Sequence, residues 1–343
     1  MNRLRVRWVV LFVAGLCLVL AAGAGVVIWQ IASSQAEQLD APGGLYEDPV
    51  WAADGFVYFL RQSQYSEGDT NEVWRTRAGG HAERVTLAGA ACPGERLTAL
   101  HARNDGRLGL LRGCADRAAL IALDPATGSS EAVMDLAGVP ADQLSLVHQV
   151  VWPAAATSAP IVASSRYQCA GLGELTTSGV RIGAPVAVDG RSWALAGSYT
   201  RPPRDCTDLG AAGFPVPYAD GFLFMAAPTT LGRPAGDRDG EAWNVYQRAG
   251  ADGAVVGRGG GYRRPWDMAR TPSCSVVISA ARDGKDGLYL DRLGGQAPQR
   301  LAAAQFRDVA VAPDGSAAVA VEERDNADDL RIVQLPKAPA TGC

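Results

Sequence analysis

One unit of roughly fifty residues recurs along most of the chain, and it restricts the possible folds more than any other feature. Each copy contains an apolar segment, a tight turn, a second apolar segment, a polar loop, a third apolar segment and a glycine hairpin before the fourth. Asp-Gly, Gly-Gly and Pro-Asp-Gly turns favour hairpins because these residues adopt positive φ at low cost. The unit therefore predicts four short antiparallel strands. Clear copies begin at Asp48, Pro265 and Phe306, and weaker copies begin near Leu97, Val147 and Phe214.

A four-stranded sheet of this size cannot bury both faces alone, and sequential copies of this length stack radially. The six copies predict an all-β fold, a six-bladed β-propeller over residues 45–343. The surplus length falls at Val188–Gly213, which we interpret as a loop insertion. The last copy shows only three clear strands, so we expect the N-terminal segment near Leu45 to complete the last blade.

The turn and strand residues of the repeats resemble a known family. Pro313-Asp314-Gly315 precedes an apolar strand, and Arg282-Asp283-Gly284-Lys285 precedes a Leu-Tyr-Leu strand, a Gly-Gly hairpin and an Arg-Leu pair. This pattern is similar to the TolB-like (WD40-like) six-bladed β-propellers of bacterial envelopes. The resemblance is closest in the first, fifth and sixth copies. It implies the propeller fold and an envelope location, and its motifs specify no function.

A charge-free segment near the N-terminus predicts a membrane anchor. The segment runs from Trp8 to Trp29 (WVVLFVAGLCLVLAAGAGVVIW), and a helix of this length spans roughly 33 Å, enough for the hydrocarbon core. Arg3, Arg5 and Arg7 precede the segment and the first acid, Glu37, follows it. The positive-inside rule therefore places the N-terminus in the cytoplasm and the propeller outside the cytoplasmic membrane.

These features divide the chain into four parts: a cytoplasmic stub, a single transmembrane signal-anchor helix, a linker and the propeller, at residues 1–7, 8–31, 32–44 and 45–343. A cleaved signal peptide is the alternative, because Ser34-Gln35-Ala36 loosely matches a small-x-small cleavage site. The apolar run is longer than the 7 to 15 residues typical of signal peptides, which favours the retained anchor.

Beyond the predicted helix the chain has six cysteines, an even number that permits three disulfides in an oxidising compartment. In a propeller, the loops between second and third strands and the loops that join blades lie on one face, which we call the B–C face. Cys92 and Cys114 lie in neighbouring loops of this face, as do Cys169 and Cys206. We therefore expect these two pairs to be bridged, which leaves Cys274 for Cys343. Free or buried thiols remain an alternative for every pair.

An arginine follows or ends the second strand in five of the six copies, which would place all five on the B–C face. A broken basic ring around one channel mouth would suit the carboxylates or phosphates of an envelope ligand. The alternative is that these side chains stabilise their own loops, for example through Asp283 or Asp325. The five candidate binding residues are Arg61, Arg112, Arg166, Arg282 and Arg324.

The sequence contains no complete match to a known catalytic or cofactor-binding pattern, so we predict no enzyme activity, no cofactor and no metal site. Gly190-Arg191-Ser192-Trp193-Ala194 lacks the second glycine of a nucleophile elbow. The glycine run Gly257–Gly261 lacks a dinucleotide-binding context, and Lys285 lacks a phosphate-loop signature. The remaining candidates are interpreted as ordinary surface, strand or loop residues: His81, His101, His148, Asp237, Asp239 and Glu241.

The formal charge of −4 argues against a nucleic-acid binder. The sequence thus predicts a membrane-anchored extracytoplasmic propeller that acts as a scaffold, binding an envelope or membrane protein partner or a small-molecule ligand. One alternative is a propeller-type hydrolase or lyase with a site in the channel, which would need a metal or paired acids there. Another is an anchor subunit that contacts a membrane protein through Gly15, Gly23 and Gly25 of the helix.

Overall fold

The computed structural model divides the chain into two compact units, Met1–Ala36 and Glu37–Cys343. The described residues all lie in the second unit apart from Ala36: 36–62, 71–88, 92–103, 105–136, 147–151, 160–166, 169–177, 179–182, 185–188, 191–194, 211–219, 221–227, 242–248, 255–325 and 327–337. The predicted membrane helix lies outside them. Within these ranges no helix has the length and apolar character needed to cross a membrane.

The regular elements of the described residues are all strands, as the repeat predicts. Three antiparallel sheets follow one another along the chain, each in sequential strand order. The first contains β2 (Leu45–Trp51), β3 (Val57–Gln62), β4 (Glu72–Thr76) and β5 (Glu83–Arg84). The second contains β6 (Arg96–Ala102), β7 (Leu108–Gly113), β8 (Ala118–Leu123) and β9 (Ser130–Asp135). The third contains β10 (Val147–Val151), β11 (Ile161–Arg166), β12 (Cys169–Thr176) and β13 (Gly179–Ile182).

The second half of the chain forms a seven-stranded sheet and the final sheet. The seven-stranded sheet contains β16 (Ala211–Tyr218), β17 (Gly221–Ala227), β18 (Trp243–Arg248), β19 (Val255–Arg270), β20 (Val276–Arg282), β21 (Lys285–Asp291) and β22 (Gln299–Ala302). The first part of β19 pairs with β18 and its last part pairs with β20, so one long strand joins two four-stranded units. The final sheet contains β23 (Phe306–Val311), β24 (Ala317–Glu322), β25 (Asp329–Gln334) and β1 (Glu37–Gln38).

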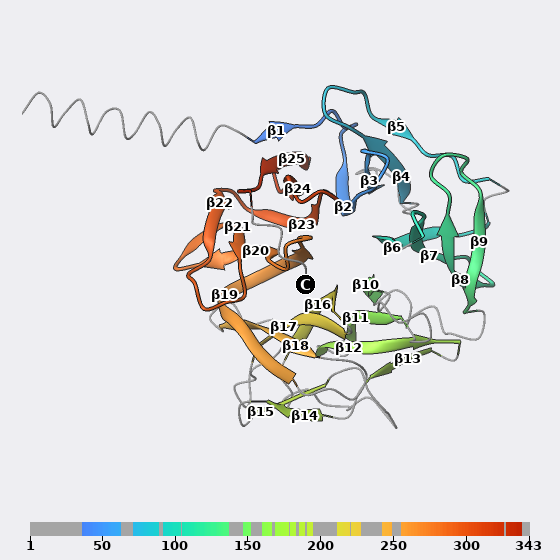
Figure 1. The fold of residues 1–343 in the computed structure, drawn as a ribbon. Helices are drawn as coiled ribbons and strands as arrows, with labels where there is room; N and C mark the ends of the chain where they lie inside the picture. Colours follow the sequence, from blue (N-terminus) through green and yellow to red (C-terminus); the bar gives the residue numbers. More distant parts are fainter. Residues whose placement is uncertain are drawn as a thin grey trace, which may run out of the picture. The chain divides into compact units, whose positions relative to one another are not determined.

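The sheets are arranged radially, as in a β-propeller (Figure 1). One strand of each unit lies at the axis, and these inner strands are β2, β6, β10, β16, the last part of β19, and β23. Each inner strand contacts the next, and β23 contacts β2, so the ring is closed. The segment interpreted as a loop insertion instead contains strand residues: β14 (Pro185–Val188) pairs with β15 (Arg191–Ala194), and β16 begins at Ala211.

The N-terminal segment completes the last sheet, as the incomplete last copy predicts, although the residues differ. Glu37 pairs with Ile332, and the Leu39 N–H donates to the Leu330 carbonyl at 2.9 Å. The strand near Leu45 is instead β2, the inner strand of the first sheet. Glu37 and Gln38 belong to the predicted linker, and a strand of two residues shows no periodicity that a sequence pattern can reveal.

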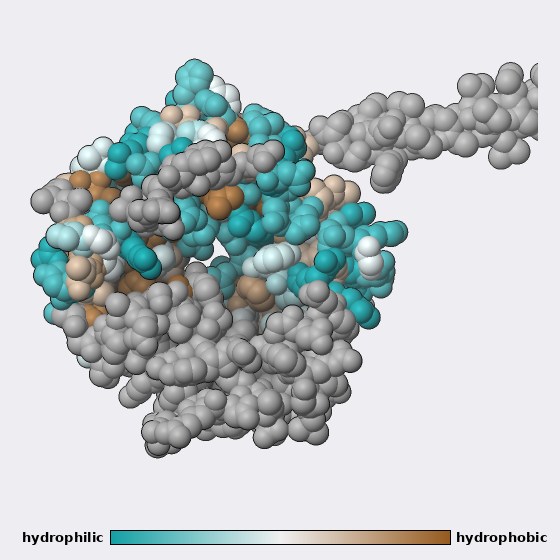
Figure 2. All heavy atoms as spheres, turned by 180° about the vertical axis from the view of Figure 1, so that it is seen from behind, coloured by the Kyte–Doolittle hydropathy of each residue, from teal (hydrophilic) through white to brown (hydrophobic). Residues whose placement is uncertain are grey.

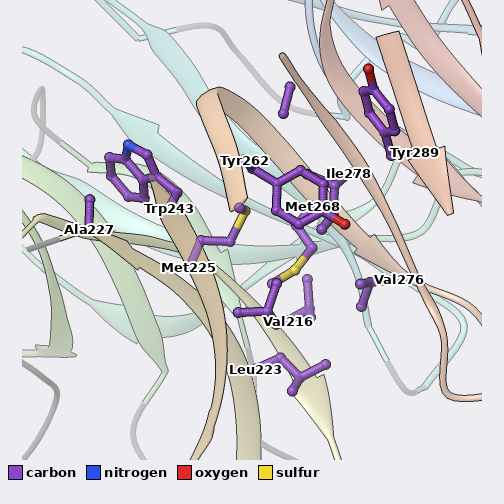
Figure 3. Packing of buried hydrophobic residues seen from close by; sticks show 12 residues of the cluster. Val216, Leu223, Met225, Ala227, Trp243, Tyr262, Met268, Val276, Ile278 and Tyr289 are labelled. Carbon is purple, nitrogen blue, oxygen red and sulfur yellow. The ribbon is translucent and has the colours of Figure 1, made fainter. Parts of the chain in front are cut away.

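Apolar side chains fill the space between successive sheets. Figure 3 shows one such cluster, in which Met225 and Trp243 from β17 and β18 lie near Tyr262, Met268 and Ile278 from β19 and β20. A sheet packed between two neighbours buries both faces, so its central strands carry continuous apolar runs rather than alternating ones. Strand β24 (AAVAVE) is an example, with five consecutive buried residues.

The Cys92–Cys114 disulfide is confirmed, with the two Cα atoms 5.7 Å apart. It joins the segment before β6 to the residue after β7, the neighbouring loops from which the pairing was inferred. Cys274 is also disulfide-bonded. Its predicted partner Cys343 lies outside the described residues, as do Cys206 and the side chain of Cys169, so the other two pairings remain predictions.

Candidate functional site

Three of the predicted binding arginines are held by residues of neighbouring segments. Arg61 donates from Nε to the Gly43 carbonyl at 3.0 Å and pairs with Glu72 at 3.3 Å. Arg112 donates from Nε to Glu95 at 2.7 Å. Arg282 donates to the Gly260 carbonyl and its guanidinium stacks over the ring of Tyr262.

Arg324 is also paired, with its Nε 2.9 Å from an oxygen of Asp329. The side chain of Arg166 lies outside the described residues. The partners differ from those expected, since Arg282 reaches Asp283 only at 4.0 Å and Arg324 pairs with Glu322 and Asp329 instead of Asp325. The four described arginines therefore all have partners within the chain, and their role in ligand binding stays a prediction.

A cavity of about 440 Å³ lies on the axis of the ring and is lined by all of the inner strands. It extends from the level of Asp48 and Asp267 to the ends of the inner strands at Trp51, Val151 and Arg270. Most of its lining is apolar. The space-filling view shows an opening at the centre of the ring (Figure 2). The polar side chains of the lining are Asp48, His101, Gln149, Asp267 and Arg270.

Three aspartates lie at corresponding positions of consecutive inner strands: Asp267 on β19, Asp308 on β23 and Asp48 on β2. Each carboxylate accepts a backbone N–H of the next strand around the ring. Asp267 accepts from Val309 at 2.9 Å, Asp308 from Asp48 at 3.2 Å, and Asp48 from Leu100 on β6 at 3.1 Å. All three strands have a β-bulge at or next to the aspartate, an irregularity that re-aims side chains.

The environment of these carboxyls raises their pKa values. Burial raises the pKa of Asp267 to about 8, and the nearby charge of Asp308 adds to the rise. Burial raises the pKa of Asp308 to about 6 and that of Asp48 well above its usual value, and for Asp48 the neighbouring carboxylates contribute. Backbone N–H bonds act in the opposite direction because they favour the charged forms. Gln149 on β10 also donates a hydrogen bond to Asp267.

The two histidines with described side chains, His101 and His81, lie in different surroundings. The His101 Nδ1 lies 2.8 Å from the Ala99 carbonyl, while its Nε2 is buried and has no hydrogen-bond partner. Burial lowers the pKa of His101 to about 4, so this ring is neutral at physiological pH. His81 is fully exposed beside Asp40, and the side chain of His148 lies outside the described residues.

The other sequence candidates that the structure describes lie in separate strands. Gly257–Gly261 lies within β19, Lys285 begins β21, and Arg191–Ala194 forms β15. Asp237, Asp239 and Glu241 lie outside the described residues. Across the described part of the chain, no three His, Cys, Asp or Glu side chains are grouped so as to hold a metal ion.

An enzyme site in the channel would need a metal or paired acids. Sequence reasoning did not identify the acids that are present there. The signal is present in the aligned copies, where Asp48 in DPVW, Asp267 in WDMA and Asp308 in RDVA occupy the same place before the first tight turn. The inner strands of a propeller line its channel, so an acid at this place in several copies predicts an acidic channel.

Comparison with known proteins supports the fold. No family model and no curated protein matches the chain. A putative gluconolactonase of known structure aligns with a TM-score of 0.51 and 14% identity, over 88% of this chain and 93% of that one. A gluconolactonase from Xanthomonas campestris aligns with a TM-score of 0.52 and 13% identity, over 90% of this chain and 93% of that one. Identities this low establish architecture alone, and the chain is accordingly a β-propeller protein.

Proposed function

We propose that this protein is a membrane-anchored, six-bladed, TolB-like propeller that binds a small ligand in its axial cavity outside the cytoplasmic membrane. The observation that carries the proposal is the cavity itself. Its volume of about 440 Å³ is typical of small-molecule sites, and its apolar walls converge on a few polar groups, as ligand pockets do.

Separate observations support the other parts of this proposal. Six inner strands and the incomplete last copy, which β1 complements, support six blades. The charge-free segment Trp8–Trp29 and the arginines before it support the anchor. An envelope protein as a second partner, bound to the outside of the ring, is compatible with this arrangement.

A variant that fills the cavity tests the proposed site. Ala269 on β19 lines the cavity, so Ala269→Trp places an indole inside it, whereas Ala78→Trp adds the same group at an exposed turn. The full chain in detergent micelles is screened against a library of aromatic fragments by ligand-observed NMR. We expect fragments to bind the wild type and the Ala78 variant and to lose binding in the Ala269 variant. Fragment binding that is unchanged by Ala269→Trp, or an absence of binding to the wild type, would overturn the proposal.

An enzyme remains the second candidate, because the structure contains the acids that such a site needs. A carboxyl with a raised pKa near neutrality is suited to general acid–base chemistry. Binding is preferred because each carboxyl already accepts a backbone N–H of the next strand, which explains its position without catalysis.

A direct assay separates the two candidates. The structurally similar proteins are named as gluconolactonases, so glucono-δ-lactone is the first probe for hydrolysis. The binding proposal expects the same hydrolysis rate in buffer, with the wild type and with Asp308→Asn. Hydrolysis accelerated by the wild type and lost in Asp308→Asn would make the protein an enzyme.

A further inference from the structure

Three carboxyl groups lie on one side of the ring at the inner end of the cavity. Asp267, Asp308 and Asp48 belong to three consecutive inner strands and are linked by the hydrogen bonds described above. Arg307, the residue before Asp308, pairs with Asp328 and donates to the Tyr46 carbonyl. Arg270 also lines the cavity, but it lies three positions along the strand from Asp267, roughly 10 Å at 3.3 Å per residue.

The carboxyls retain capacity to bind another donor. An ionised carboxylate offers about four acceptor positions, and Asp48 and Asp308 each accept one backbone N–H through Oδ2. Asp48 and Asp308 are partly buried residues and Asp267 is 7% exposed, and Asp48 and Asp267 line the cavity. A group that brings several N–H donors and a positive charge would therefore satisfy open acceptors and reduce the repulsion among these acids.

We propose that the axial cavity binds a small molecule with an apolar body and a protonated amine, with the ammonium group lying beside Asp48 and Asp267 and near Asp308. This inference rests on the proposed ligand-binding function and names the class of ligand. A primary ammonium has three donors in a compact group, which matches acceptors contributed by neighbouring strands. The apolar walls formed by residues such as Pro49, Val150 and Pro215 suit a hydrocarbon or aromatic body.

Other ligand classes fit these features less well. An anion would be repelled by the three carboxyls. A neutral ligand would leave their mutual repulsion in place, since it brings no charge to offset it. A divalent cation prefers a dense shell of oxygen ligands, and the described residues contain no group of three side chains that provides one.

The pH dependence of the affinity provides an independent signature of this mode of binding. Burial and mutual repulsion raise the pKa values of the three aspartates, so part of the set is protonated near neutral pH. An ammonium favours the ionised forms, and affinity for an amine should therefore increase as the pH rises from about 5 to about 8. The groups that face the set on the packed strands are Glu47 on β2, His101 on β6, Gln149 on β10, Arg270 on β19, Arg307 on β23 and Asp328 before β25.

The test compares three probes of nearly equal shape on the full chain in detergent micelles. Phenethylamine carries the ammonium, 2-phenylethanol is the neutral analogue and phenylacetate is the anionic analogue, with affinities measured by calorimetry at pH 5 and pH 8. We expect phenethylamine to bind at least about tenfold more tightly than 2-phenylethanol at pH 8, as a charge-assisted hydrogen bond implies. This preference should shrink at pH 5, and phenylacetate should bind most weakly.

Two variants that each remove one negative charge test whether the acidic residues cause the preference for the amine. Asp308→Asn keeps an oxygen for the Asp48 N–H and should remove most of the amine preference. Asp283→Asn removes the same charge from an exposed turn, where the side chain is 89% exposed, and should change nothing. If Asp308→Asn fails to fold, Asp48→Asn replaces it, since an amide oxygen there can still accept the Leu100 N–H.

The outcomes distinguish this inference from the function on which it rests. Equal binding of phenethylamine and 2-phenylethanol, with both lost in Ala269→Trp, would overturn the amine preference and leave the cavity as the binding site. An amine preference that survives Ala269→Trp would overturn both. An amine preference that disappears equally in the Asp308 and Asp283 variants would assign it to overall charge and overturn the inference.

Discussion

The inner strands fall into two sets that differ in the residue at one corresponding position. In the acidic set, β19, β23 and β2, this position holds Asp267, Asp308 and Asp48, and each carboxyl bonds to the next strand. In the neutral set, β6, β10 and β16, the corresponding residues are Ala99, His148 and Phe214. Ala99 is buried in an apolar cluster, and Phe214 lies 6.0 Å from Trp243. The β-bulge is thus accompanied by side-chain hydrogen bonds in the acidic set. On β6 and β16 of the neutral set it is accompanied by apolar packing.

The position of the acidic set within the ring shows what its polar bonds add. The two ends of the ring meet where β23 contacts β2, and here Asp308 accepts the Asp48 N–H. Asp328 reinforces the same junction by accepting the Tyr46 N–H at 2.8 Å. The neutral set has no chain ends to join, and its β6–β7 pair is held instead by the Cys92–Cys114 disulfide. We infer that the acids hold the closure of the ring and, as a consequence, leave negative charge on one side of the cavity.

The largest expected effect is a fall in stability with rising pH that originates in the acidic set. The raised pKa values mean that the folded protein holds protons which the unfolded chain releases, so the free energy of unfolding should decrease from about pH 4 to about pH 8 and then level off. Asp308, with a pKa near 6 against a usual 3.8, would account for about 3 kcal/mol at about 1.4 kcal/mol per unit. Urea unfolding followed by tryptophan fluorescence between pH 4 and pH 9 measures this slope.

Asp308→Asn is the control, and it should flatten the slope between pH 4 and pH 6. His101 in the neutral set acts with the opposite sign, because its lowered pKa gives a contribution that is lost as the pH falls from 6.5 to 4. His101 does not titrate between pH 6.5 and pH 8, so the slope in this interval reports on Asp267, whose pKa is about 8. A stability that rises across this interval would show that Asp267 does not have a raised pKa.

Sequence alone could predict the local features of the inner strands but not the acidic set. Turns such as Ala52-Ala53-Asp54-Gly55 were predictable because their chemistry is local, and Gly55 indeed has a φ of +84°. The Cys92–Cys114 bridge followed from the face on which two neighbouring loops lie. The acidic set was not recognised, because Asp48 is separated from Asp267 and Asp308 by most of the chain and all three resemble the many aspartates of turns. Only closure of the ring, where β23 contacts β2, brings Asp308 against Asp48.

The second largest effect should come from the disulfide of the neutral set. Cys92 and Cys114 are 22 residues apart, and removing a bridge over such a loop costs about 3 kcal/mol in chain-entropy terms. The double variant Cys92→Ser and Cys114→Ser should lower the free energy of unfolding by that amount and leave the pH slope unchanged. The double variant is preferable to a reductant because Cys274 is also disulfide-bonded. A changed pH slope would mean that the two sets are coupled.

A smaller loss is expected when one bond of the acidic set is removed. Asp267→Ala leaves the buried Val309 N–H without its acceptor and removes the partner of Gln149, which should cost about 2 kcal/mol. Asp116→Ala, at an exposed loop position, is the matched control and should fall within about 0.5 kcal/mol of the wild type. Urea unfolding at pH 6 measures both variants, and equal stabilities would refute a structural role for the Asp267 bond.

The smallest effect tests whether the neutral set depends on packing. The His101 ring lies over Gly109 on β7, where an added Cβ would stand 2.2 Å from Nε2. Gly109→Ala should therefore cost about 1.5 kcal/mol through overpacking, whereas Gly113→Ala on the same strand, where no atom lies within 4 Å, should cost almost nothing. Adding His101→Ala to Gly109→Ala should recover stability relative to Gly109→Ala alone, because the methyl group then fills space vacated by the ring. If the two substitutions instead add independently in urea unfolding, the ring and the glycine are not in energetic contact, and packing would not explain how β6 is held without an aspartate.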